Sequence, residues 1–364
     1  MVRLRRGVVE GLGAARPGAL ELRVRLADGQ LVQALAYAEL TGEPRTGETV
    51  LVNTTALERG LGTGGLALVV ALPDRTDDDL PAGPSGRPGH VVKARYTPLQ
   101  TMVLGVDEQE SPHHALLAEA DDLAGMPVVV ADLHSALPAI VVGVERERPG
   151  TRVAYVMTDG GALPAAFSTT VAVLRERGAL ACCLTVGQAY GGDLEAVTVH
   201  SALLAARLVV GADLVVVAQG PGNLGTGTRW GFSGVVAGEA VNAAVTLGGR
   251  AVASLRVSQA DPRERHRGVS HHSRTAYGRV ALVPADVPVP RLTGQIGELV
   301  SAQADALVEQ SGGRLVRHDV KVDDLEPALR ASPVTLRTMG RGYDDDPASF
   351  LAAAAAGRHA ASLL

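Results

Sequence analysis

A glycine-rich stretch, residues 220–228 with the sequence GPGNLGTGT, has the composition of an anion-binding loop. Its glycines permit positive φ and close backbone approach, and its Asn and Thr side chains supply hydrogen-bond donors. The stretch follows the apolar run 214–217 and precedes a helix expected to start at its N-cap, Ser233. Exposed N–H groups and a positive helix end would then face one point, where phosphate or carboxylate binds well. We expect the following residues to bind the ligand: Gly220, Gly222, Asn223, Gly225 and Thr226.

A second stretch with chemical potential is the segment 261–274, DPRERHRGVSHHSR, which lacks apolar periodicity and is therefore expected to be a loop. Its histidines, His266, His271 and His272, could bind a metal together with Asp261, or could serve as general acid and base. Four arginines outnumber the two acidic residues, which disfavours a divalent cation and favours phosphate or carboxylate. We rank an anion clamp formed by Arg265 and Arg267 above a metal site, and a solvated loop without a ligand is the remaining alternative.

Polar residues follow the expected strands, and open α/β sheets bind ligands beyond the carboxyl ends of their strands. We expect Asp159, His271 and His272 to transfer protons in this crevice. The alternative is that Asp132 and Asp159 only cap helices, because loops after strands are polar in any case. The residues that follow the strands are Asp132, His134, Thr158, Asp159, Gln188, Gln219, Ser258 and Asp261.

Three of the glycines also match the dinucleotide-binding pattern G-x-G-x-x-G. The expected helix begins only at Ser233, outside the motif. The next strand is followed by Arg256 and Ser258 rather than by the acidic residue that would hold a ribose. A standard NAD site is therefore disfavoured, and the sequence identifies no cofactor.

Alternating strand and helix patterns begin near Ser111 and predict a doubly wound, mostly parallel sheet. The segment after Ser135 is ambiguous, because the run 140–144 fits either a strand or a helix. The strands are expected at 128–131, 153–157, 180–185, 214–217, 251–257, 280–283 and 315–320, and the helices at 163–177, 194–210, 233–247, 296–309 and 347–356.

Residues 1 to about 72 carry short alternating runs that predict a small β-barrel, and we assign residues 1–110 to this domain. The segment 73–89 is rich in Asp, Pro and Gly, so we expect an exposed, mobile loop there. Two further strands, 91–96 and 101–106, follow this loop, and the barrel is expected to close after it. The Rossmann-like α/β domain would then comprise residues 111–364.

Composition limits the class of protein. A formal net charge of −5 and a pI near 6.1 argue against a general nucleic-acid binder. The adjacent cysteines Cys182 and Cys183 would point to opposite faces of a strand, which fits a reducing compartment. Neither a signal peptide nor a membrane span is visible, so we expect a cytoplasmic protein without a membrane partner. The barrel could serve assembly into a homo-oligomer.

Three runs, RYTPLQTMVLGVDEQESPHH, GTGTRWGFSG and RERHRGVSHHS, resemble the uncharacterised bacterial family known as domain of unknown function 3866. The resemblance covers nearly the whole chain. It implies a bacterial protein with a barrel followed by an α/β domain, and it implies no activity. From the residues we expect an enzyme that acts on a small phosphorylated or carboxylated metabolite. The alternatives are a non-catalytic metabolite sensor or a regulatory scaffold that uses the same crevice.

Overall fold

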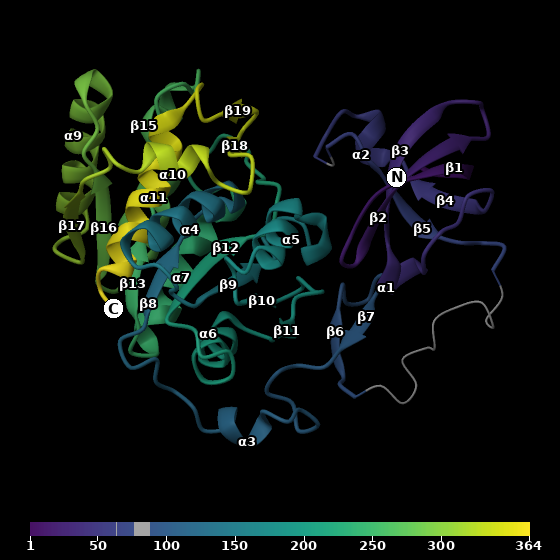
Figure 1. The fold of residues 1–364 in the computed structure, drawn as a ribbon, viewed down its shortest axis with the longest axis horizontal. Helices are drawn as coiled ribbons and strands as arrows, with labels where there is room; N and C mark the ends of the chain where they lie inside the picture. Colours follow the sequence, from purple (N-terminus) through teal and green to yellow (C-terminus); the bar gives the residue numbers. More distant parts are fainter. Residues whose placement is uncertain (63, 76–87) are drawn as a thin grey trace. The chain divides into compact units, whose positions relative to one another are not determined.

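The computed structural model divides the chain into two compact units, Met1–Val103 and Leu104–Leu364 (Figure 1). It describes residues 1–62, 64–75 and 88–364. The sequence had placed the division near Ser111. Most of the loop predicted at 73–89 lies outside the described residues.

The first unit contains a closed five-stranded barrel in the order β1-β2-β3-β5-β4, as the alternating patterns predict. The side chains of Leu22 and Val24 on β2 are buried, whereas Arg23 and Arg25 between them are exposed, so one face of the strand fills the barrel. The barrel strands are β1 (Leu4–Arg16), β2 (Ala19–Leu26), β3 (Leu31–Tyr37), β4 (Thr49–Asn53) and β5 (Ala67–Ala71), and the short helices are α1 (Ala38–Thr41) and α2 (Thr55–Glu58).

The expectation that the barrel closes with the later strands is wrong. Strands β6 (Val91–Lys93) and β7 (Thr101–Val103) pair with each other in a separate two-stranded antiparallel sheet. The barrel needs neither of them, because β5 pairs with both β3 and β4.

The second unit is built on an eight-stranded sheet in the order β11-β10-β9-β12-β8-β13-β16-β17. All of its strand pairs are parallel, which confirms the predicted sheet type. Its strands are β8 (Pro127–Val130), β9 (Val153–Thr158), β10 (Cys182–Thr185), β11 (Leu194–Glu195), β12 (Leu214–Gln219), β13 (Arg250–Ala253), β16 (Ala285–Pro290) and β17 (Leu315–Val320).

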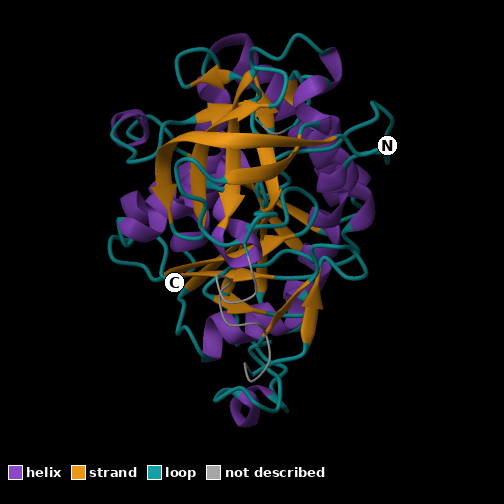
Figure 2. Ribbon diagram, turned by 90° about the vertical axis from the view of Figure 1, so that its right-hand side faces the viewer, coloured by secondary structure: helices purple, strands orange, loops and turns teal. Residues whose placement is uncertain are grey.

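Helices cover both faces of this sheet, so its central strands are buried on both sides (Figure 2). Cys182 packs into the core on one face and Cys183 into the core on the other, as their adjacency predicts. One face is covered by α6 (Val199–Leu208), α7 (Val236–Thr246) and α9 (Gly294–Gln310). The other is covered by α4 (Leu137–Glu147), α5 (Thr169–Glu176) and α11 (Pro347–Ala361), with α10 (Glu326–Arg330) at its border. The ambiguous run 140–144 is thus helical.

Three predicted elements differ from the structure. The helix expected at 194–210 begins only at Val199, because residues 194–195 form the strand β11. The strand expected at 280–283 is wrong, because a π-helix, Ala276–Val280, ends there and the strand β16 starts only at Ala285. The segment 261–274 is not entirely loop. It contains the short strand β15 (Gly268–Val269) and the start of α8 (His271–Thr275), which is too short to give a periodic apolar pattern.

The described part of the chain contains no helix that is both long enough and apolar enough to cross a membrane.

Candidate functional site

The carboxyl ends of four adjacent strands define the candidate site. Strand β12 lies between β9 and β8, and β13 pairs with the other side of β8, all in parallel. From β8 the chain continues to β9, toward one end of the sheet, whereas from β12 it continues to β13, toward the other end. A reversal of this kind is a topological switch point, where open α/β sheets bind ligands. The polar residues that the sequence places after the strands therefore lie at one edge.

The glycine-rich stretch closes on itself as a small hairpin, residues 225–232, which we call the glycine hairpin. Gly225 and Phe232 form an antiparallel bridge, and the Thr226 N–H donates to the Gly231 carbonyl at 2.7 Å. The hydroxyls of Thr226 and Thr228 lie 3.1 Å apart, and the Thr228 hydroxyl accepts from the Gly231 N–H. Much of the predicted donor capacity is thus used inside the hairpin.

The residues just before the hairpin anchor it to the sheet. The Asn223 side-chain oxygen accepts from the Gln219 amide at 3.0 Å and from the Ser233 hydroxyl at 3.1 Å. Ser233 also accepts from the Leu224 N–H, so it holds the hairpin rather than capping the helix as predicted. The helical segment does begin at Ser233, with a 3-10 turn that leads into α7.

The sequence predicts that a ligand approaches the backbone of Gly220 and Gly222 closely. In the structure, the loop after β9 makes this close approach. A Cβ atom added to Gly161, after β9, would lie 2.2 Å from the Gly220 carbonyl oxygen and 2.7 Å from that of Gly222. Gly222 has a φ of 92°, which side chains other than glycine rarely adopt. These glycines pack the loop after β12 against the loop after β9.

The Arg/His segment, residues 261–274, is fixed at both ends. Val257 and Val269 pair in the small antiparallel ladder of β14 (Val257–Ser258) with β15. Asp261 is buried and accepts two hydrogen bonds from the Arg263 guanidinium, and Arg341 lies 3.3 Å away. The contact with Arg263 lowers the pKa of Asp261 far below its usual value. Asp261 therefore serves as an ion-pair partner rather than as a metal ligand together with the histidines.

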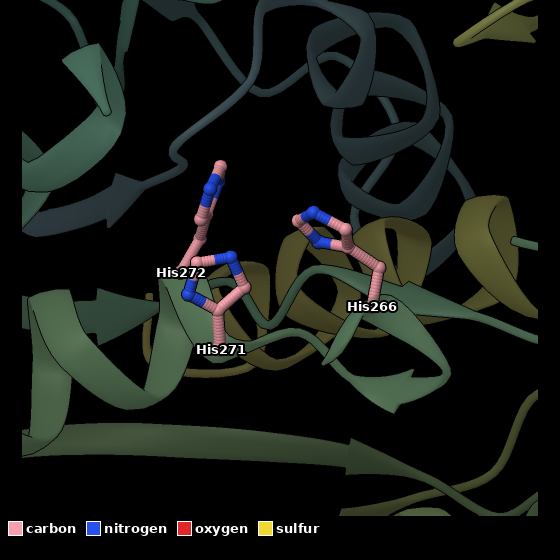
Figure 3. Close-up of side chains that lie close together, drawn as sticks. All are labelled: His266, His271 and His272. Atoms are coloured by element: carbon pink, nitrogen blue, oxygen red, sulfur yellow. The ribbon is translucent and has the colours of Figure 1, made fainter. Parts of the chain in front are cut away.

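The three histidines of the segment form a compact cluster (Figure 3). The ring centroid of His271 lies 4.4 Å from that of His272 and 4.8 Å from that of His266. Ser270 supports the cluster, because its hydroxyl lies 2.8 Å from Nδ1 of His266 and caps α8 by accepting from the His272 N–H. Arg256 Nη1 donates to Nδ1 of His272 at 2.9 Å.

The electrostatic surroundings keep two of these rings neutral. Burial, followed by the charges of Arg256 and Arg263, lowers the pKa of His266 to about 3. Burial also lowers the pKa of His271 to about 4, with further contributions from His272 and Arg265. Burial is the larger cause of both shifts, and the arginine charges that add to it make the local field positive, which stabilises a negative charge.

Two buried nitrogen atoms in this field lack hydrogen-bond partners within the described structure. They are Nε2 of His271 and Nε of Arg274, which lie one turn apart on α8. Arg274 Nε always carries a proton, and His271 Nε2 carries one in one of the two neutral tautomers of its ring. A buried donor without a partner costs about 1–3 kcal/mol, so in that tautomer both atoms favour a ligand that accepts hydrogen bonds.

The glycine hairpin and the Arg/His segment meet, as the sequence predicts. Phe232 at the base of the hairpin stacks on His272, with centroids 3.8 Å apart and planes 5° apart. At the turn, a Cβ atom added to Gly227 would lie 3.8 Å from Nη2 of Arg265. The two segments thus line the same side of the candidate site.

A small cavity, mostly apolar but with three polar residues in its wall, lies beneath the start of α7. Its volume is about 10 Å³, roughly what one water molecule needs, and Asp132, Thr158 and Gln219 are in its wall. Each of these buried residues has a side-chain oxygen without a hydrogen-bond partner among the residues described: Oδ2, Oγ1 and Oε1, respectively. Asp132 Oδ2 lies 3.5 Å from Nδ1 of His272 and 3.9 Å from Nη1 of Arg256, which connects the cavity to the cluster.

Two residues expected in the site have other surroundings. Asp159 follows β9, and its carboxylate accepts from the Gln188 N–H at 2.8 Å, so its interactions are with the loop after β10 rather than with the histidines. Arg267 is exposed, and its carbonyl accepts from the side-chain amide of Gln303 on α9 at 3.5 Å. Neither interaction brings these side chains to His271.

Among the residues that the structure describes, two groups have ligand atoms close enough to hold a metal ion, within 4.8 Å of one another. In the histidine cluster, Arg256 already donates to the lone pair of His272 Nδ1, so a metal on that atom would displace a guanidinium. In the second group, His318 and His359 each lie within hydrogen-bond distance of Asp286, at 3.1 and 2.9 Å. Arg250 donates to Asp286 as well, so this carboxylate is engaged by protein donors.

The sequence places Asp132 at the crevice and Arg274 among the four arginines of segment 261–274, but it does not assign Arg256 to the site. Arg256 is a lone arginine after a strand, and its burial beside Asp132 has no sequence signature. A signal did exist for Arg274, because it lies three residues after His271 and would share a helix face with it. That spacing has no meaning in a segment expected to be loop.

Comparison with known proteins gives a family and no activity. No curated protein and no solved structure matches the chain. The model of a family described as "Protein of unknown function (DUF3866)" matches residues 33–357, which include the barrel strands from β3 onward and almost all of the α/β unit. The chain therefore belongs to the DUF3866 family of unknown function.

Proposed function

We propose that this protein is an enzyme that binds a small phosphorylated or carboxylated metabolite at the carboxyl edge of its parallel sheet. The observation that carries the proposal is the pair of unpartnered buried nitrogens, His271 Nε2 and Arg274 Nε, within a positive local field. An anion satisfies both nitrogens and offsets the charges of Arg256, Arg265 and Arg274. A cation would add to the repulsion.

The catalytic part of the proposal assigns proton transfer to His271. Its imidazole is neutral in the free protein, and the negative charge of a bound ligand would raise its pKa toward the neutral range. Asp132 is the carboxylate of the site, because its Oδ2 lies 3.5 Å from His272. In this role it takes the place that the sequence had given to Asp159. Phe232 and Arg256 hold the His272 ring in one orientation.

The first experiment is calorimetric titration with inorganic phosphate. We expect His271→Ala and Arg274→Lys to weaken binding, the second because lysine keeps the charge but lacks the Nε of the guanidinium fork. Arg177→Lys makes the same substitution at an exposed position after α5 and is expected to bind like wild type. Equal affinity in all four proteins would contradict the proposed site.

A second experiment separates an enzyme from a sensor. Native mass spectrometry of the purified protein, with release of any co-purified metabolite, supplies the natural ligand, and turnover of that metabolite is then followed. We expect His271→Gln to abolish turnover while retaining most of the affinity. Binding without turnover by the wild-type protein would support the sensor instead.

A further inference from the structure

We infer that the ligand is an anion that carries a planar aromatic ring, of the nucleoside phosphate type, and that Trp230 stacks on this ring. The inference rests on the proposed function, because it assigns the anion to the same site. It adds a class of substrate and a residue that determines specificity.

Trp230 is the chain's only tryptophan, and its side chain is 55% exposed. A tryptophan usually buries most of its large surface, whereas this one is exposed on the hairpin that borders the candidate site. It is not part of the core. Phe232, two residues further on, fills the packing role and is 5% exposed.

The backbone around Trp230 is held in place. The bridge between Gly225 and Phe232 and the hydrogen bonds between Thr226 and Gly231 close the hairpin on either side of it. A fixed backbone lowers the entropy that a stacking side chain loses when it binds. The tip of the hairpin can therefore present an aromatic face without first being ordered.

Charge and aromaticity occur together at this hairpin. Its base stacks on His272, and Arg265 Nη2 lies near Gly227 in its turn, so cationic and imidazole groups border the segment that carries Trp230. An exposed ring beside guanidinium groups is the combination that binds nucleotides, with the base on the ring and the phosphate on the cations. A simple phosphate or carboxylate would leave the indole unused.

The single tryptophan makes the inference directly measurable. We would titrate the full-length protein with adenosine monophosphate and with ribose 5-phosphate, which has the same phosphate and sugar without the base. Adenosine monophosphate should quench or shift the indole emission and bind about 5- to 100-fold more tightly than ribose 5-phosphate. In calorimetry, Trp230→Ala should reduce its affinity to that of ribose 5-phosphate, and Trp230→Phe should retain most of it.

The control is Leu282→Ala, which removes an apolar side chain that is 72% exposed outside the hairpin and should leave both affinities unchanged. Equal affinities for the two probes in wild type and Trp230→Ala would overturn the inference and leave the anion site intact. A failure of inorganic phosphate and both probes to bind would overturn the proposed function itself. Should Trp230→Ala change only the oligomeric state in light scattering, the indole serves protein contact and the inference is wrong.

Discussion

Arg256 Nη1 donates a hydrogen bond to Nδ1 of His272 at 2.9 Å, so the neutral imidazole carries its proton on Nε2. Nη1 of Arg256 also lies 3.9 Å from Oδ2 of Asp132, and the Arg256 side chain is only 7% exposed. This guanidinium is a fixed cation at the centre of the candidate site. It orients one histidine and contributes to the low pKa values of the other two.

Replacing this cation should therefore raise the histidine pKa values. In Arg256→Met, we expect the pKa of His266 to rise from about 3, and that of His271 from about 4, toward their usual value of 6.5. Burial still opposes the charged form, so the rise should be incomplete. NMR titration of the imidazole nitrogens measures both values, and unchanged pKa values would show that Arg256 does not set the local field.

The same substitution leaves Asp132 buried without its cation. Loss of one partner of a buried pair costs about 3–5 kcal/mol, so Arg256→Met should unfold at a lower denaturant concentration. The double variant Asp132→Asn with Arg256→Met removes both charges and should recover part of this loss. This variant also keeps the NMR test available if the single variant is poorly folded.

The buried histidines predict a sign for the pH dependence of stability. Since the folded-state pKa of His271 lies below the unfolded value, its neutral form stabilises the fold above pH 6.5, and that contribution is lost as the pH falls toward about 4. The free energy of unfolding, measured by denaturant titration between pH 7 and pH 4, should fall more steeply for wild type than for His271→Gln. Sulfate remains a dianion over this range and should reduce the loss more in wild type than in the variant.

Sequence reasoning located the glycine-rich loop because its signals were local. Four apolar residues before a glycine-rich run predict a buried strand followed by an unusual loop, and β12 and the glycine hairpin occur there. The parallel sheet follows from the alternation of strands and helices, and it brings Gly227 and Arg265 together although they are distant in the chain. The meeting of the two segments was therefore predictable from topology.

What the sequence could not provide depends on burial and pairing. From residue type alone, the hydroxyls of Thr226 and Thr228 are donors available to a ligand. Only the structure shows that these two hydroxyls form a hydrogen bond with each other inside the hairpin. Asp132 and Asp159 both follow strands, and only the contacts separate the carboxylate next to His272 from the one that binds the loop after β10. A five-residue helix such as α8 has too few turns to produce a pattern.

Arg265 and Arg267 should differ in their effect on phosphate binding, although the sequence assigns both to the anion clamp. Arg265 lies beside the turn of the glycine hairpin, whereas the backbone of Arg267 is bonded to α9. We expect Arg265→Ala to weaken phosphate binding about 5- to 10-fold, equivalent to about 1–1.4 kcal/mol for a solvent-accessible contact. Arg267→Ala should change it less than twofold, and calorimetry at one ionic strength compares them. An equal loss in both variants would restore the clamp that the sequence predicted.

Asp286 should stabilise the far end of the sheet. It accepts from Arg250, and His359 lies 2.9 Å away, so Asp286→Asn should lower the free energy of unfolding by about 1–3 kcal/mol at pH 7. Burial raises the Asp286 pKa, but the His359 contact and nearby positive charges lower it below its usual 3.8 overall. The stabilisation is therefore present above pH 3.8 and lost as the pH falls through the folded value. Asp305→Asn, at an exposed ion pair, is the control and should cost less than about 1 kcal/mol.

Gly161 should determine how the glycine hairpin is positioned. A Cβ atom at this residue would lie 2.2 Å from the Gly220 carbonyl oxygen, so Gly161→Ala must separate the loops after β9 and β12. Overpacking of this kind costs about 1–3 kcal/mol, and we expect a matching fall in unfolding free energy together with weaker phosphate binding. Gly342→Ala is the control, because its Cβ would meet nothing nearer than 3.7 Å. If Gly161→Ala lost stability but bound phosphate like wild type, the loop contact would support the fold without positioning the site. Wild-type stability would contradict the close packing itself.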